Sequence, residues 1–319
     1  MRSLLTLKRV YWQQWQAMQL FAAEHREFDF FWNWEMDMRY IGHHLHFLSA
    51  ITSFAAKQPR KYLWERSSRY YLAGVHGTWA RFADWVASVV PPALSVWGPV
   101  PAFGSIENLA VTPSSAVVDD DFTDAVGAEA DLISSLPFFN PENTLWSYRD
   151  KIWNFRQGVT TPRRVYINTF SRLSRKLLDA MDAENKVGKS MASEMWPATV
   201  ALHYGLKAVY APHPIWSSRE WPPHYANSVF NIGSDVSPGS GQDAVYSPDR
   251  EHNFGSLSWY FWSSFPGTLY RRFLGWDVAD EFGHVLRLEA QAQHRMCLPA
   301  MLLHPVKQVR FKDRASFMP

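Results

Sequence analysis

Residues 29–40 read Asp-Phe-Phe-Trp-Asn-Trp-Glu-Met-Asp-Met-Arg-Tyr, and this stretch decides which fold the sequence supports. Its first half is a nearly continuous aromatic run, the pattern of a short strand that is buried on both faces, as in a parallel sheet. Its second half places two carboxylates, Glu35 and Asp37, two positions apart and follows them with Arg39. Residues two apart on an extended chain point the same way. We therefore expect both carboxylates to reach into one site.

The chemistry of this pair points to a cation. Open α/β sheets bind ligands at the carboxyl ends of their strands, and paired carboxylates there suit a hard cation with its phosphates. Glu35 and Asp37 are therefore predicted to hold Mn²⁺ or Mg²⁺. The alternative is that both are solvated loop charges and that Arg39 pairs with one of them, because a Glu-x-Asp pattern by itself is short.

Helix and strand patterns alternate outward from this stretch. We expect an amphipathic helix over 9–27, the strand over 28–34, a helix over 40–56, a strand over 163–168, a helix that Ser171 caps and that reaches about Glu184, a helix from Ser193 and Glu194 to Gly205, a strand over 207–210, and a helix near 281–295. This order predicts an α/β fold with a mostly parallel central sheet flanked by helices.

Composition limits the class of protein. The 319 residues are 47% hydrophobic and 16% aromatic, which excludes a disordered chain and predicts one α/β domain over 1–319 with irregular insertions at about 91–128 and 232–256. A net charge of +2 argues against a nucleic-acid partner, and the single Cys297 excludes an internal disulfide. We find no transmembrane segment and no signal peptide, so the chain as written is expected in the cytoplasm.

Three further positions carry candidate chemistry. His43 and His46 share one face of the expected helix and are a candidate zinc pair for a metal-dependent hydrolase. We favour a histidine that lines a polar cleft or packs in the core, because no Glu-x-x-His or second histidine cluster nearby completes a metal site. His213 lies between two prolines, and its rigid backbone suits a ligand to a metal or a phosphate. Glu194 is either a partner of the helix dipole or a base that projects into the cleft.

Three segments carry a family resemblance. They are Trp-Glu-Met-Asp-Met-Arg-Tyr-Ile-Gly at 34–42, Ser-Glu-Met-Trp-Pro at 193–197, and Gly-Leu-Lys-Ala-Val-Tyr-Ala-Pro-His-Pro at 205–214. In this order they resemble the fungal domain-of-unknown-function 3405 family, whose members share W-E-x-D-x-R-x-x-G, S-E-x-x-P and G-L-K-x-x-x-x-P-H-P. The resemblance covers most of the chain and implies no established activity.

A looser similarity is to nucleotide-sugar glycosyltransferases of the GT-A type. It implies a Rossmann-like fold and transfer of a hexosyl group from a nucleotide-sugar donor to a carbohydrate or glycan acceptor, with Mn²⁺ on an acidic motif. The implied roles are metal ligation by Glu35, Asp37 and His213 (or His252), catalysis by Glu194 and Arg39, and nucleotide contact by Trp34, Arg39 and His43.

Two features depart from the GT-A pattern. The motif is Glu-x-Asp rather than Asp-x-Asp, and only 34 residues precede it, whereas nucleotide-binding strands come first in that pattern. We therefore expect part of the N-terminal nucleotide-binding half to be missing. The alternative function is a catalytically degenerate or truncated carbohydrate-binding or scaffold protein on the same fold. The resemblance also implies the Golgi or secretory lumen for a full-length form.

Overall fold

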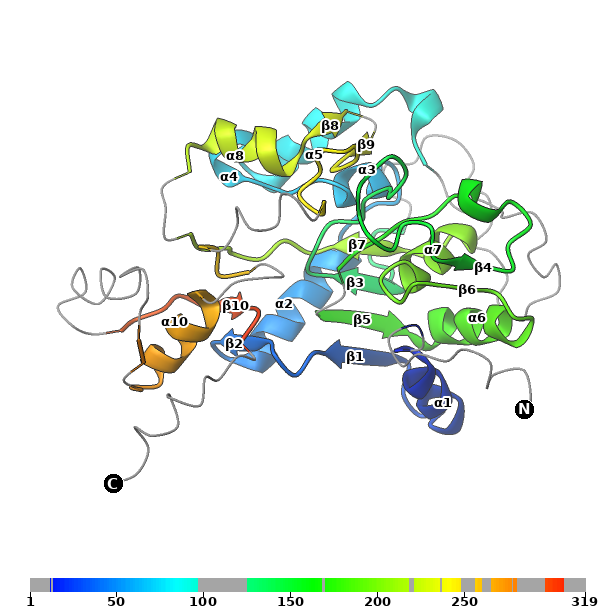
Figure 1. Ribbon diagram of the computed structural model, residues 1–319, viewed down its shortest axis with the longest axis horizontal. Coiled ribbons are helices and arrows are strands. Elements are labelled where there is room, and N and C mark those ends of the chain that lie inside the picture. Colours follow the sequence, from blue (N-terminus) through cyan, green and yellow to red (C-terminus); the bar gives the residue numbers. More distant parts are fainter. Residues whose placement is uncertain are drawn as a thin grey trace.

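The computed structural model (Figure 1) describes residues 12, 14–96, 125–167, 170–217, 221–235, 237–247, 256–259, 265–276, 278–279 and 296–306. Structural statements below concern these residues. The helix expected near 281–295, His252, and large parts of both expected insertions lie outside them.

A mixed sheet forms the centre of the described structure. Its strands are β1 (Phe30–Trp34), β5 (Phe170–Ser174), β3 (Leu132–Ser134) and β7 (Ala208–Tyr210), in the spatial order β1-β5-β3-β7. β5 pairs antiparallel with both β1 and β3, while β3 and β7 are parallel. The α/β class is confirmed, but the expectation of a mostly parallel sheet is wrong.

The connection between β3 and β5 explains the difference. After β3 the chain leaves the sheet and returns beside its own path, where Phe139 and Val165 form an antiparallel bridge. β5 therefore starts at the edge where β3 ends and must run back along it. The sequence did not reveal this reversal, because β5 reads Phe-Ser-Arg-Leu-Ser and was expected to be the start of a helix rather than a strand.

Two expectations about strands are also wrong. The aromatic run is not buried on both faces, because β1 pairs with β5 alone among the described residues and Phe31 is its one buried residue. The strand expected at 163–168 is reduced to the bridge at Val165, and Ser171 lies inside β5 rather than at a helix cap. Ser174 caps the next helix instead, where its hydroxyl accepts a hydrogen bond from the Leu177 amide at 3.0 Å.

Helices cover the sheet on both sides (Figure 1). The first helix, α1, packs against α6, α6 packs against α7, and α3 packs against β7. The bounds are α1 Gln16–Glu24, α2 His44–Ala56, α3 Leu63–Ser67, α4 Ala73–His76, α5 Trp79–Val89, α6 Arg175–Lys186, α7 Trp196–His203, α8 Pro223–Phe230 and α10 Phe265–Phe273. As predicted, a glycine with positive φ, Gly205 at 62°, follows α7 and redirects the chain into β7.

Short ladders and turns complete the described part. β2 (Arg39–Ile41) pairs antiparallel with β10 (Met301–Leu303), β4 (Ile152–Trp153) with β6 (Ser190–Met191), and β8 (Gly233–Ser234) with β9 (Ser237–Pro238). Two 3₁₀ turns span Pro92–Leu94 and Gly158–Thr160.

Lys207 ties the helical layer to the sheet. Its ammonium donates hydrogen bonds to the carbonyl oxygens of Ala56, Ala125 and Ala128, at 2.9, 2.7 and 2.8 Å. Ala56 is the last residue of α2, and Lys207 directly precedes β7 and is 5% exposed. One buried cation therefore joins the carbonyl at the end of α2 to two carbonyls of the 125–128 segment.

The chain segments that carry the predicted site residues meet at one edge of the sheet. β1, β3 and β7 run in the same direction, so their carboxyl ends meet at one edge, and β5 begins there. The segments 35–38 and 211–216, which follow β1 and β7, and 163–167, which precedes β5, all lie along this edge.

Candidate metal centre

A tight turn after β1 presents the two predicted carboxylates. The Met38 amide donates to the carbonyl oxygen of Glu35 at 3.2 Å, which folds 35–38 back on itself. The guanidinium of Arg39 donates to the carbonyl oxygens of Met36 and Met38 at 2.7 and 2.6 Å. Arg39 therefore holds the backbone that carries Asp37, which makes it a positioning residue for this turn.

A distant segment brings a histidine to the same turn. β10 pairs with β2, with Leu303 opposite Arg39, and the Val306 amide donates to the carbonyl oxygen of Asp37 at 2.8 Å. The residue that follows β10 is His304. Its own amide donates to the carbonyl oxygen of Ser258 at 3.0 Å. The ladder thus fixes the backbone of His304 beside the acidic turn.

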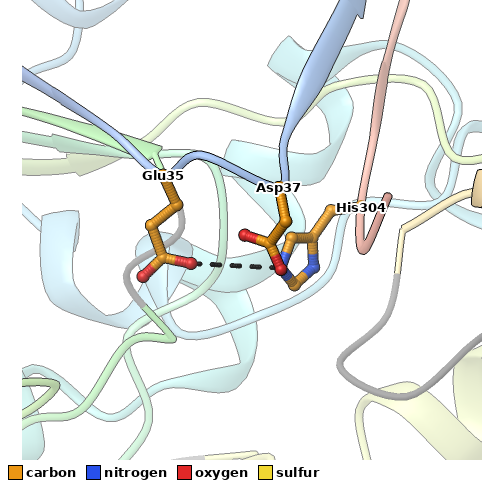
Figure 2. A group of neighbouring side chains, drawn as sticks. All are labelled: Glu35, Asp37 and His304. Carbon is orange, nitrogen blue, oxygen red and sulfur yellow. Dashed lines mark ion pairs between the residues drawn. The ribbon is translucent and has the colours of Figure 1, made fainter. Parts of the chain in front are cut away.

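Glu35, Asp37 and His304 converge (Figure 2), with one ligand atom from each lying within 4.8 Å of the others. His304 Nε2 is 3.6 Å from Asp37 Oδ2 and 4.0 Å from Glu35 Oε2. Both distances exceed a direct hydrogen bond. They are at or slightly beyond the spacing of neighbouring ligands around an ion whose bonds are about 2.0–2.2 Å long, so a small movement of the side chains would close the group on a cation.

The donor set fits a divalent cation. Asp37 and His304 are buried, at 8% and 5% exposure, and Glu35 is partly open to solvent. His304 Nδ1 is buried and has no hydrogen-bond partner among the described residues, while Nε2 is the ring nitrogen that faces the two carboxylates. Two carboxylates and an imidazole favour Mn²⁺ or Zn²⁺ over Mg²⁺, which prefers oxygen ligands throughout.

The ring of Trp259 lies between His213 and this group of ligands. It follows β7, and its ring packs edge-on against Trp259 with a centroid distance of 4.7 Å. Trp259 packs in turn against His304 at 5.2 Å. His213 is outside the group of converging ligand atoms, and the structure places His304 where the sequence had suggested His213.

The stability of the protein is expected to depend on pH through His213. Burial lowers the pKa of His213 to about 4, although a weaker backbone hydrogen bond to Pro214 raises it. An unfolded histidine has a pKa of about 6.5, so the unfolded chain binds this proton more tightly. The contribution is fully present above pH 6.5, falls as the pH drops from 6.5 to 4, and amounts to about 3 kcal/mol.

Urea unfolding at pH 7 and pH 4 measures this dependence. Between pH 7 and pH 4, the free energy of unfolding of wild type should fall by about 3 kcal/mol more than that of His213→Asn. His224 is exposed, so His224→Asn should lose as much free energy of unfolding between pH 7 and pH 4 as wild type does. Equal losses in wild type and His213→Asn would contradict the expectation.

Glu194 faces the same region through Tyr166. The Tyr166 amide donates to the carbonyl oxygen of Glu194 at 3.1 Å. Burial raises the pKa of the Tyr166 hydroxyl, and the negative charges of Glu35 and Glu194 raise it further. Glu35 and Glu194 therefore share Tyr166 as a neighbour on which both charges act.

Trp34 directly precedes Glu35, and His43 lies at the start of α2. The Trp34 ring packs edge-on against Phe170 at 5.1 Å and lies 5.6 Å from the His44 ring. His43 caps α2, where its Nδ1 accepts a hydrogen bond from the His46 amide at 3.4 Å. His43 and His46 are exposed and do not belong to the metal-ligand group found among the described residues.

Sequence reasoning missed His304. A weak signal existed, because Met301-Leu302-Leu303 is a short apolar run that ends in a histidine and a proline, as a strand with a polar tip would. The run is three residues long, and nothing local connects it with residue 37.

Comparison with known proteins identifies a family. The family model described as "Protein of unknown function (DUF3405)" matches residues 2–308. No curated protein matches the chain, and no solved structure does. Within the described residues, no helix combines the length and the apolar character needed to cross a membrane.

Proposed function

The chain belongs to the DUF3405 family of proteins of unknown function, and from the centre formed by Glu35, Asp37 and His304 we propose that it is a Mn²⁺-dependent glycosyltransferase that uses a nucleotide-sugar donor. One observation carries the proposal: an acidic pair and a buried histidine converge at the carboxyl-end edge of an α/β sheet. This edge is where such sheets bind phosphate-bearing ligands.

The donor set supports a cation that carries phosphate. Three protein ligands leave positions open on a six-coordinate ion, and phosphate oxygens can fill them. A divalent cation held there would offset the charge of a departing nucleoside diphosphate. Glu35 and Asp37 supply the negative charge that retains the cation, and His304 supplies the nitrogen ligand.

The neighbouring residues fit further roles. Glu194 is partly buried and electrostatically close to the centre, as a base that takes a proton from an acceptor hydroxyl must be. Trp34 directly precedes Glu35 and is partly exposed, so its ring suits contact with a base or a sugar. Arg39 acts by holding the turn.

His304→Gln tests this proposal in thermal melting with Mn²⁺ and a panel of nucleoside diphosphates. A ligand at one hundred times its dissociation constant stabilises the folded state by about 2.7 kcal/mol. Wild type should show this stabilisation with Mn²⁺ plus one nucleotide. Changes outside the ligand shell alone cost 10–100-fold in metal affinity, so we expect the variant to lose about 100-fold.

The exposed His224→Gln is the matched control and should keep the full Mn²⁺ effect. A sugar-nucleotide hydrolysis assay on the same samples should show release of nucleoside diphosphate that needs both Mn²⁺ and His304. If wild type and His304→Gln respond equally to Mn²⁺, the centre does not bind the metal. Sugar binding that ignores EDTA and nucleotide would instead indicate a non-catalytic carbohydrate-binding protein.

A further inference from the structure

A second polar pocket lies away from the metal centre, between α3, the β8–β9 hairpin and the segments that flank residues 140 and 164. Its wall includes Trp64, Glu65, Ser68, Asn140, Arg164 and Ser237. None of these residues belongs to the metal centre, so any ligand of this pocket binds independently of the metal.

Glu65 is the first reason to consider a ligand. The residue is 4% exposed, and one of its carboxylate oxygens, Oε1, accepts a hydrogen bond from the Val96 amide. The other, Oε2, is buried and has no hydrogen-bond partner among the described residues. A buried carboxylate oxygen without a partner is costly. Burial accordingly raises the pKa of Glu65.

Arg164 also lines the pocket and has donors to spare. Its guanidinium carries five N–H groups and donates one hydrogen bond within the described structure, to the carbonyl oxygen of Arg163 at 2.9 Å. The guanidinium also lies 6.0 Å from the centre of the Trp64 ring. The pocket therefore offers an acceptor, several donors and an aromatic wall.

This charge balance selects the class of ligand. Arg164 disfavours a cation and Glu65 disfavours an anion, whereas a hydroxyl group both donates to a carboxylate and accepts from a guanidinium. The cavity volume of about 20 Å³ exceeds the roughly 10–15 Å³ that one water needs. That is room for one or two groups of the size of a water or a hydroxyl, so only the edge of a larger molecule fits. We propose that this pocket binds the hydroxyl-bearing edge of a neutral saccharide, with Glu65 and Arg164 holding adjacent hydroxyl groups.

Glu65→Gln tests the pocket directly in the full-length chain. Binding of methyl glucoside, methyl galactoside and methyl mannoside is titrated by ligand-observed NMR in EDTA and without nucleotide. The glutamine keeps an oxygen for the Val96 amide but replaces the unpartnered oxygen with a donor. We expect at least one glycoside to bind, and its affinity to fall about 10-fold or more in Glu65→Gln, because a charge-assisted hydrogen bond is lost.

A matched control separates the pocket from general charge effects. Glu142 is exposed and, like Glu65, raises the pKa of Arg164, but it does not line the pocket. Glu142→Gln should therefore leave glycoside binding unchanged. Arg164→Lys provides a second variant should Glu65→Gln not fold. It removes the planar fork and should also weaken binding.

Three results would overturn the inference. They are no binding of any neutral glycoside at 50 mM, binding that Glu65→Gln leaves intact, and equally tight binding of glucuronate or glucosamine. The test does not depend on the proposed glycosyl transfer. Asp37→Asn should abolish the Mn²⁺ effect and leave glycoside binding in EDTA unchanged, so each proposal can fail alone.

Discussion

Replacing Asp37 by Ala is expected to abolish the stabilisation of this protein by Mn²⁺ and any Mn²⁺-dependent release of nucleoside diphosphate. Asp37 is the buried carboxylate of the centre and lies closest to His304, at 3.6 Å between Oδ2 and Nε2. Without it, the remaining carboxylate, Glu35, is partly exposed and has solvent as a competing partner. At a Mn²⁺ concentration one hundred times the wild-type dissociation constant, the loss amounts to about 2.7 kcal/mol.

Thermal melting with and without Mn²⁺ measures this loss, and isothermal titration gives the affinity. Asp37→Asn keeps the shape of the side chain and removes its charge, so it should weaken Mn²⁺ binding almost as much. Asp179→Ala is the control. This aspartate pairs with Arg26 at 2.9 Å on the surface, and such a pair contributes about 0–1 kcal/mol. A Mn²⁺ response that persists in Asp37→Ala would show that the metal binds at a site other than this centre.

Lys207→Met is expected to destabilise the fold by about 3 kcal/mol or more. The substitution preserves most of the side-chain volume but removes the donor to Ala56, Ala125 and Ala128. A hydrogen bond to a charged group contributes about 1.5–3 kcal/mol. The carbonyls of Ala56 and Ala125 keep a second hydrogen bond, from the Gly127 and Ala128 amides at 2.8 and 3.1 Å, which lowers the total. The end of α2 and this segment should then separate from β7.

Urea unfolding at pH 7 measures the effect as the difference in free energy of unfolding. Lys186→Met is the matched control, because its ammonium is 66% exposed and pairs with Asp182 one helical turn away. Such a pair contributes about 0.3–0.5 kcal/mol. If Lys207→Met unfolds within 0.5 kcal/mol of wild type, the three hydrogen bonds contribute little to stability. A large loss would explain the lysine of the Gly-Leu-Lys segment as a structural residue.

Local features of the site were predictable. The strand over 28–34, the pair Glu35 and Asp37 after it, and the turn at Gly205 into the strand at 207–210 depend on residues close together in the chain. Hydrophobic runs, side-chain alternation and helix-ending glycines act over a few residues. Hence both carboxylates were expected at a strand end, and the structure places them together.

The role of Arg39 was not predictable in the same way. A guanidinium beside two carboxylates suggests an ion pair or a phosphate contact. In the folded turn its donors instead reach the backbone carbonyls of Met36 and Met38. Which acceptor it takes depends on how tightly 35–38 folds back, and the sequence does not show that curvature.

The sequence by itself determined which carboxylates stand at the end of the first strand, and it located that strand and the strand at 207–210 but not β5. The tertiary structure alone decided the direction of β5, the exposure of β1 and the arrival of His304 at Asp37. These features depend on pairing between segments far apart in the chain, and such pairing is set by the loops between them and by the packing of the whole core. A short strand such as 301–303 carries no local signal of the partner with which it pairs, so the third metal ligand became visible only when β10 paired with β2.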